Sequence, residues 1–141
     1  VVAIIGTLAA VGVVAYNGYT AAAKKNASKA IHANLVKFVA SELAKCNLDS
    51  DATIMSGAAS CGDDANTIAE ALAGDDSPLQ DKDPYDGGSA VVGEASGDPE
   101  GDTVITGTEQ AEGSSDPTTI TIVTQFSAAT ADTLTNTIEV E

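Results

Sequence analysis

Three aspartates precede a glycine pair and could supply carboxylate oxygens to a cation: Asp81, Asp83 and Asp86. Ca²⁺ takes about six to eight such oxygens in a flexible loop. The spacing departs from that of an EF-hand, because Gly87 comes one position late and Val92 occupies the place of the bidentate acid. Lys82 adds a positive charge within the loop. These departures favour a solvated acidic turn over a calcium site.

The two cysteines, Cys46 and Cys61, enclose a short loop of aspartate, serine, alanine and glycine. One pair in a polar loop, without C-x-x-C spacing, is typical of a disulfide formed in an oxidising compartment. Closing a loop of this length stabilises a protein by about 3 kcal/mol on the chain-entropy model. Two free thiols are the alternative. A metal site is disfavoured, because the only imidazole, that of His32, lies well upstream.

The sequence offers no set of residues for a catalytic mechanism. His32 is the single histidine and has lysines nearby, so neither a Ser-His-Asp nor a Cys-His arrangement is expected, and we interpret it as a surface histidine. The acid pairs Asp63–Asp64 and Asp75–Asp76 lie on predicted turns, without an apolar pocket to raise a carboxyl pKa. We therefore expect a protein that is not an enzyme and that has no cofactor.

Charge is divided sharply along the 141-residue chain. Residues 1–45 carry a net charge of +4, whereas residues 46–141 carry −19. A region this acidic repels phosphate, since nucleic-acid binding depends on basic groups that displace counterions. We therefore expect an acidic, soluble head that binds no nucleic acid.

The element that positions these residues is a long N-terminal helix. Residues 1–23 carry no charge, and the first 16 are apolar apart from Gly6, Thr7 and Gly12. Alanine is abundant and proline is absent from residues 1–45, which are predicted to form one helix. A helix that is apolar on every face must be buried all round, by lipid or by copies of itself. The large apolar side chains available for this burial are Val1, Val2, Ile4, Ile5, Leu8, Val11, Val13 and Val14.

The second half of this helix, residues 24–45, is amphipathic. It contains five of the six lysines in the chain and a single acid, Glu42. An apolar stripe follows the helical repeat and is expected to pack on the head: Ile31, Leu35, Phe38, Val39 and Leu43. Three lysines directly follow the uncharged segment and are expected to face carboxylates of the same or a neighbouring head: Lys24, Lys25 and Lys29.

The head, residues 46–141, is predicted to contain a short helix and a small sheet. The helix is expected at residues 65–73, with Asp63 or Asp64 as its N-cap and Gly74 at its end. Runs rich in β-branched residues predict strands at residues 103–108, 118–126 and 133–140, and a short edge strand at 89–92. One long helix followed by an antiparallel sheet is an α+β fold, in which the sheet covers the second half of the helix.

The N-terminal residues closely resemble the stem of type IV pilins. The matching run is VVAIIG…LAAV…AYNGYTAAAKK, and residues 1–16 align with the family pattern without a gap. In the head, the DPYDGG segment at residues 83–88 is similar to the Asn/Asp-Pro-Tyr turn of many relatives. The head looks most similar to small pilins of marine bacteria.

The chain also departs from the family pattern. The family's opening segment, with its processing-site phenylalanine and its glutamate, would precede Val1, so we expect a short upstream segment. The usual helix proline aligns with Val14, which keeps a backbone hydrogen bond that proline would remove. Gly6 and Gly12 are expected to loosen the helix in its place. The family's disulfide near the chain end is missing, and the only possible pair lies where stem and head meet.

The resemblance implies a structural subunit that polymerises into an extracellular type IV pilus for adhesion, motility or uptake. Residues 1–23 would form the filament core. Before assembly the same residues would hold the subunit in the inner membrane, where the pilus assembly machinery acts on it. An alternative is a pseudopilin of a type II secretion system, a related protein with a calcium-binding loop in its head. A third class is a binding module anchored by one membrane span, which would form no filaments.

Overall fold

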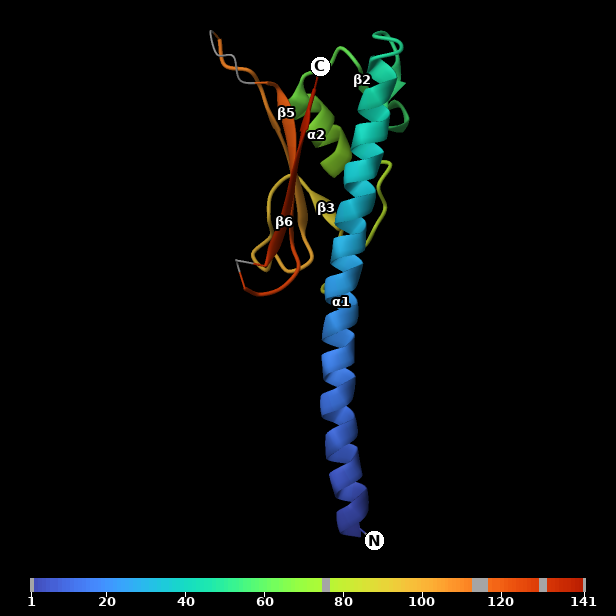
Figure 1. Ribbon diagram of the computed structural model, residues 1–141, viewed down its shortest axis with the longest axis vertical. Helices are drawn as coiled ribbons and strands as arrows, with labels where there is room; N and C mark the ends of the chain where they lie inside the picture. The colour runs from blue at the N-terminus through green and yellow to red at the C-terminus, as the bar shows by residue number, and fades with distance from the viewer. Residues whose placement is uncertain (1, 75–76, 113–116, 130–131, 141) are drawn as a thin grey trace.

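A single long helix dominates the shape of the molecule (Figure 1). The computed structural model describes residues 2–74, 77–112, 117–129 and 132–140. Helix α1, Val2–Cys46, has 45 residues, which gives it a length of about 68 Å. Its bounds lie within one residue of those predicted. The second half of α1 contacts the head, and the first half projects from it.

The face of α1 that packs against the head is a mixed polar and apolar stripe. Its buried residues are Ser28, His32, Leu35, Val39 and Glu42. Leu35 and Val39 confirm the predicted stripe, whereas Ile31, Phe38 and Leu43 lie only half-buried beside it. The line of contact predicted from the apolar pattern is shifted from the observed one. The pattern considered apolar residues alone, whereas the observed contact includes polar residues whose partners lie elsewhere in the head.

The head contains a four-stranded sheet in the order β3-β4-β5-β6. Its strands are β3 (Val91–Val92), β4 (Thr103–Thr108), β5 (Thr119–Gln125) and β6 (Thr133–Glu139). The three long strands are antiparallel, as predicted, but β3 pairs with β4 in parallel. The sheet is therefore mixed, which corrects the expectation of an antiparallel sheet. The parallel pair arises because residues 93–102 return the chain to the same end of the sheet before β4 begins.

Both helices cover one face of the sheet (Figure 1). Helix α2, Ala65–Ala73, packs mainly on β4, and α1 packs mainly on β5. Asp64 caps α2, because its Oδ1 accepts a hydrogen bond from the Thr67 N–H at 2.7 Å. The fold is thus α+β in two layers. Aliphatic side chains fill the space between the layers, and the fully buried ones include Leu35, Val39, Ile68, Leu72, Ile105, Ile120 and Ile122.

One glycine sets how closely α2 approaches the sheet. A Cβ on Gly107 of β4 would collide with the carbonyl group of Ala65, the first residue of α2. Any other residue at this position would push the helix away from β4. The contact brings Ile68 and Leu72 of α2 into the buried core.

The segment between the two cysteines has structure that the sequence did not predict. It forms β1 (Thr53–Ile54), a 3-10 helix η1 (Met55–Gly57) and β2 (Ala59–Ser60), and β1 pairs antiparallel with β2. Strands of two residues leave no periodic pattern to detect. Ile54 and Met55 are fully buried, so this segment extends the core to the end of α1.

Candidate functional site

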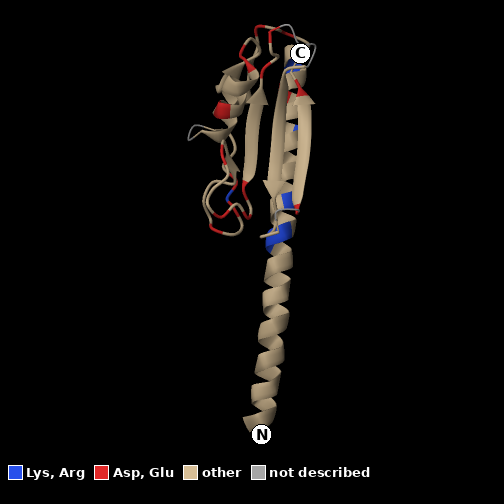
Figure 2. Cartoon of the chain, turned by 90° about the vertical axis from the view of Figure 1, so that its left-hand side faces the viewer, with Lys and Arg blue, Asp and Glu red and all other residues tan. Residues whose placement is uncertain are grey.

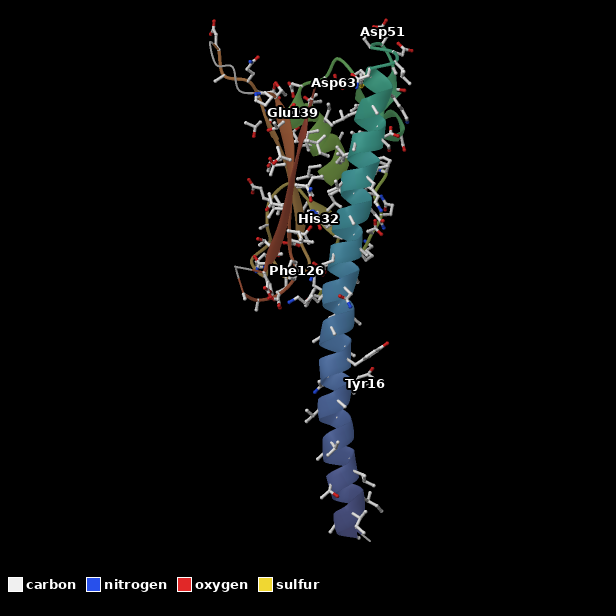
Figure 3. The ribbon with its side chains drawn as sticks, in the orientation of Figure 1. Tyr16, His32, Asp51, Asp63, Phe126 and Glu139 are labelled. Atoms are coloured by element: carbon white, nitrogen blue, oxygen red, sulfur yellow. A yellow bond between two sulfur atoms is a disulfide. The ribbon has the colours of Figure 1, made fainter. Side chains whose placement is uncertain are left out.

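The first half of α1 presents its apolar side chains to the outside of the molecule (Figure 3). No residue from 2 to 23 is buried, and the large apolar side chains there are at least 60% exposed. By length and composition α1 qualifies as a candidate membrane span. Val1 lies outside the described residues, and the other predicted core residues all belong to this surface: Val2, Ile4, Ile5, Leu8, Val11, Val13 and Val14. An apolar surface of this size requires a partner.

Helix α1 continues without interruption through Gly6 and Gly12. Nothing lies within 4 Å of a Cβ placed at either glycine, so each leaves open surface where another helix can approach. The loosening expected at these glycines concerns the assembled filament and stays a prediction.

Lysines directly follow the stem, which we define as residues 2–23 of α1, where α1 meets the base of the head (Figure 2). The Nζ atom of Lys25 lies 3.0 Å from Oδ2 of Asp132, in the same molecule. Ser127 Oγ also donates to Asp132 Oδ2, at 2.7 Å. The Ser127 hydrogen bond, followed by that of Lys25, lowers the pKa of the Asp132 carboxyl below its ordinary value. This part of α1 is therefore tied to its own head.

The neighbouring lysines lie over aromatic rings. Lys24 Nζ is 5.3 Å from the ring centre of Tyr85, and Lys29 Nζ is 4.3 Å from that of Phe126. The Tyr85 hydroxyl donates a hydrogen bond to the Phe126 carbonyl at 2.9 Å, which holds the two rings at the base of the head. Cation–π contacts of this kind contribute about 0.5–1 kcal/mol at exposed sites. The expected contacts with a neighbouring head remain a prediction for all three lysines.

His32 connects α1 to the sheet inside the core, which corrects its interpretation as a surface histidine (Figure 3). It is 3% exposed. Its Nδ1 lies 2.8 Å from Thr124 Oγ1, and its Nε2 lies 2.8 Å from Asn136 Oδ1. Thr124 Oγ1 lies 2.7 Å from Thr103 Oγ1. Because Asn136 Oδ1 only accepts, Nε2 donates to it, and a ring with one proton then accepts at Nδ1 from Thr124.

The partners of His32 explain why its burial was missed. They lie 92 and 104 positions away in the sequence, and each sits on a strand whose pattern is dominated by β-branched residues. A lone histidine among lysines has no periodic signal of its own. Its spacing of three from Leu35 and seven from Val39 was the one available hint that it shares their face of the helix.

Glu42 anchors the disulfide-bonded segment to the end of α1. Cys46 and Cys61 form the predicted disulfide, with Cα atoms 5.3 Å apart. Between them Met55 adopts a left-handed φ of 52°, and its N–H donates to Glu42 Oε2 at 2.7 Å. Lys45 donates to the other oxygen of Glu42. Hydrogen bonding by Lys45, assisted by that of Met55, lowers the pKa of the Glu42 carboxyl below its ordinary value.

The three calcium candidates are not brought together. In the ranges that the structure describes, no group of three or more metal-ligating side chains is found. Asp83 is buried, and its Oδ1 accepts from the Tyr85 N–H at 2.6 Å. Asp86 is exposed and accepts from the Gly88 N–H at 2.7 Å, while Asp81 is also exposed. Asp83 and Asp86 each accept a backbone hydrogen bond within the loop, although the burial of Asp83 differs from the solvated turn expected from the sequence.

The Asp83 carboxylate is enclosed by the loop that precedes β4. A Cβ on Gly101 would collide with Asp83 Oδ1, and Gly101 has a φ of +98°, so glycine is required there. The other oxygen, Oδ2, is buried without a hydrogen-bond partner. Burial raises the pKa of the Asp83 carboxyl, and the charges of Asp86 and Asp102 raise it further.

Comparison with protein-family models, with curated proteins and with solved structures gives no match to the chain. The architecture is nevertheless compatible with a pilin fold. It combines a long apolar N-terminal helix, a small sheet that covers the second half of that helix, and a disulfide in the head.

Proposed function

We propose that this protein is a structural subunit that polymerises into an extracellular type IV pilus. The exposed stem carries the proposal, because residues 2–23 have neither charge nor a buried side chain. Removing one side chain such as Leu8 or Ile5 from water stabilises a protein by about 1.5–3 kcal/mol. A bundle of stems gains this contribution many times over, and the role is structural rather than catalytic.

The placement of the head supports a bundle of this kind. The first half of α1 projects beyond the head, so all sides of the stem are open to neighbouring stems (Figure 1). Gly6 and Gly12 give neighbouring helices room to approach closely. In such a polymer the stems form the centre, and the acidic heads cover the outside.

The same stem can hold the unassembled subunit in the inner membrane before it joins a filament. Residues 2–23 extend about 33 Å as a helix, which is close to the thickness of a bilayer's hydrocarbon core, about 30 Å. The disulfide-bonded head then lies on the oxidising side of that membrane. The assembly machinery would transfer the stem from lipid to the filament, where adhesion, motility or uptake would follow.

A pseudopilin of a type II secretion system is the second candidate. Its calcium-binding head loop would have to use Asp81, Asp83 and Asp86, of which the structure buries one and leaves two exposed. The pilin is therefore favoured. Calcium content of the purified protein and the length of its filaments separate the two candidates.

The test compares two exposed leucines, one in the stem and one in the head. Leu8 in the stem is 68% exposed and Leu48 in the head is 90% exposed. Cells that produce the wild-type chain or Leu48→Glu should release filaments on shearing, visible by negative-stain electron microscopy. Leu8→Glu should give none, although the protein is present in the membrane fraction. Filaments from Leu8→Glu cells, or a wild-type chain that stays monomeric in the membrane, would overturn the proposal.

A further inference from the structure

The sheet has one long free edge, on β6. This strand is last in the sheet, and no strand in the described part of the chain pairs with its second side. Hydrogen bonds from the Val140 N–H to the Thr118 carbonyl and from the Phe126 N–H to the Asp132 carbonyl fix the phase of the β5–β6 ladder. Residues 134, 136 and 138 therefore bond to β5. The backbone groups that point to the free edge belong to Thr133, Thr135, Thr137 and Glu139.

This edge lacks the features by which proteins usually prevent strand pairing. β6 is seven residues long, contains neither proline nor lysine, and carries one charged residue, Glu139. Its edge-facing residues are all exposed. An edge of this length and composition is a template for another extended chain.

A groove with both apolar and polar side chains in its lining lies between β6 and the end of α1. It has a volume of about 240 Å³, and its lining includes Ala40, Leu43 and Ala44 of α1, Ile138 and Glu139 of β6, and Val140 directly after β6. Alternate side chains of a strand point to opposite faces of a sheet. A strand added to β6 would thus direct every second side chain towards α1, and those near Ile138 would enter the groove.

Charge decides which chain fits this edge. Residues 46–141 carry a net charge of −19, and Glu139 adds a negative charge to the free edge itself, whereas Asp132 beyond the other end of β6 is paired with Lys25. A second copy of this protein, with a net charge of −15, is repelled, whereas a cationic segment is attracted. We propose that β6 binds an extended, lysine- or arginine-bearing segment of another protein by strand addition, with its alternate apolar side chains facing α1. This interaction uses β6 and the second half of α1, and it does not depend on polymerisation.

A peptide titration of the full chain in a non-ionic detergent tests the proposal. The probe is the capped peptide Lys-Val-Lys-Val-Lys-Val-Lys, and the readouts are calorimetric affinity and amide hydrogen exchange. Binding should slow exchange at Thr133, Thr135 and Thr137. Thr135→Pro removes an edge-facing N–H and leaves the β5 ladder intact, so it should weaken binding about tenfold. The matched control, Thr135→Ala, should bind like the wild type.

Two further peptides keep the test decisive if Thr135→Pro does not fold. The same peptide with N-methyl groups on one edge of its backbone should not bind, and neither should Glu-Val-Glu-Val-Glu-Val-Glu. Equal binding of either peptide would overturn the proposal, as would equal affinities of Thr135→Pro and Thr135→Ala. Slow exchange of the β6 amides at high protein concentration without peptide would show that a second copy occupies the edge, which also overturns it.

Discussion

Hydrogen bonds of the His32 ring connect α1 to both β5 and β6, through Thr124 and Asn136. Replacing the ring by alanine leaves Thr124 buried without that partner and opens a cavity. An unsatisfied buried polar group costs about 1–3 kcal/mol. We therefore expect His32→Ala to lower the free energy of unfolding of the full chain in detergent by about 2 kcal/mol or more. Asn34→Ala, at an exposed position on the same helix, is the control and should change it little.

Glu42 predicts a specific loss of stability in acid. Its pKa is lowered in the folded state, so its contribution is complete above the unfolded pKa of 4.5 and is lost as the pH falls through the folded value. Glu42→Gln should be less stable than the wild type at pH 7, and the difference should shrink below pH 4.5. Thermal unfolding between pH 3 and 7 measures this. A difference in unfolding temperature between the two proteins that stayed constant from pH 7 to pH 3 would contradict this prediction.

Asp83 predicts the opposite pH dependence. Its pKa is raised in the folded state, so the ionised carboxylate costs stability once the pH rises above the ordinary pKa of 3.8. Asp83→Asn should therefore unfold at a higher temperature than the wild type at pH 7. This advantage should fade in acid, where the wild-type carboxyl is protonated. If Asp83→Asn unfolded at a lower temperature than the wild type at pH 7, the prediction would be contradicted, because burying the amide would then cost more stability than burying the carboxylate.

At the scale of elements, the sequence predicted the helices and strands that have a periodic residue pattern. It missed the elements whose structure depends on residues far away in the chain. Helix α1, α2 and the three long strands were found to within about two residues, because each has a strong local pattern. The parallel pairing of β3 was missed, since strand direction depends on the path of residues 93–102. The small elements between the cysteines were also missed, because a buried Met55 in a left-handed conformation is stabilised by Glu42 and not by its neighbours in sequence.

The residues of the candidate site also fall into a group that the sequence predicted and a group that it missed. The stem residues and the disulfide could be predicted, because a charge-free run and a single cysteine pair are visible in the sequence. The contacts of Lys24 and Lys29 with aromatic rings could not. Tyr85 and Phe126 lie far from the lysines in the chain, and only the folded sheet brings them to the base of the head.

The disulfide predicts a large effect on one element. The Cys46–Cys61 bond closes the loop that holds β1, η1 and β2 against the end of α1. Cys46→Ser with Cys61→Ser should lower the free energy of unfolding by about 3 kcal/mol. Reduction of the wild type should give the same unfolding temperature as the double variant. Little change in either would show that Glu42 and the buried Ile54 hold the segment unaided.

For the whole molecule, the net charge predicts how the proposed assembly into filaments responds to salt. Each copy carries a net charge of −15, and crowded heads repel one another. The Debye length falls from about 30 Å at 0.01 M salt to about 8 Å at 0.15 M. Filament yield, measured by sedimentation, should therefore rise over this range. Charge reversal of Lys24 and Lys25 should lower the yield most at low salt, and a yield independent of salt would contradict this account.

Helix α1 runs without a break from the stem to the end that contacts the head, and in the proposed filament this continuity would determine which contacts bear an applied tension. Tension would enter through the stems and be transmitted along the backbone hydrogen bonds of α1. The sheet lies beside α1 and is attached to it by side chains such as His32, so stretching α1 would not pull the strands apart one after another. The disulfide at Cys46 lies at the far end of α1 and carries little of the force. In the proposed polymer, stem contacts would therefore set the tensile strength, and the head could vary in sequence without weakening the fibre.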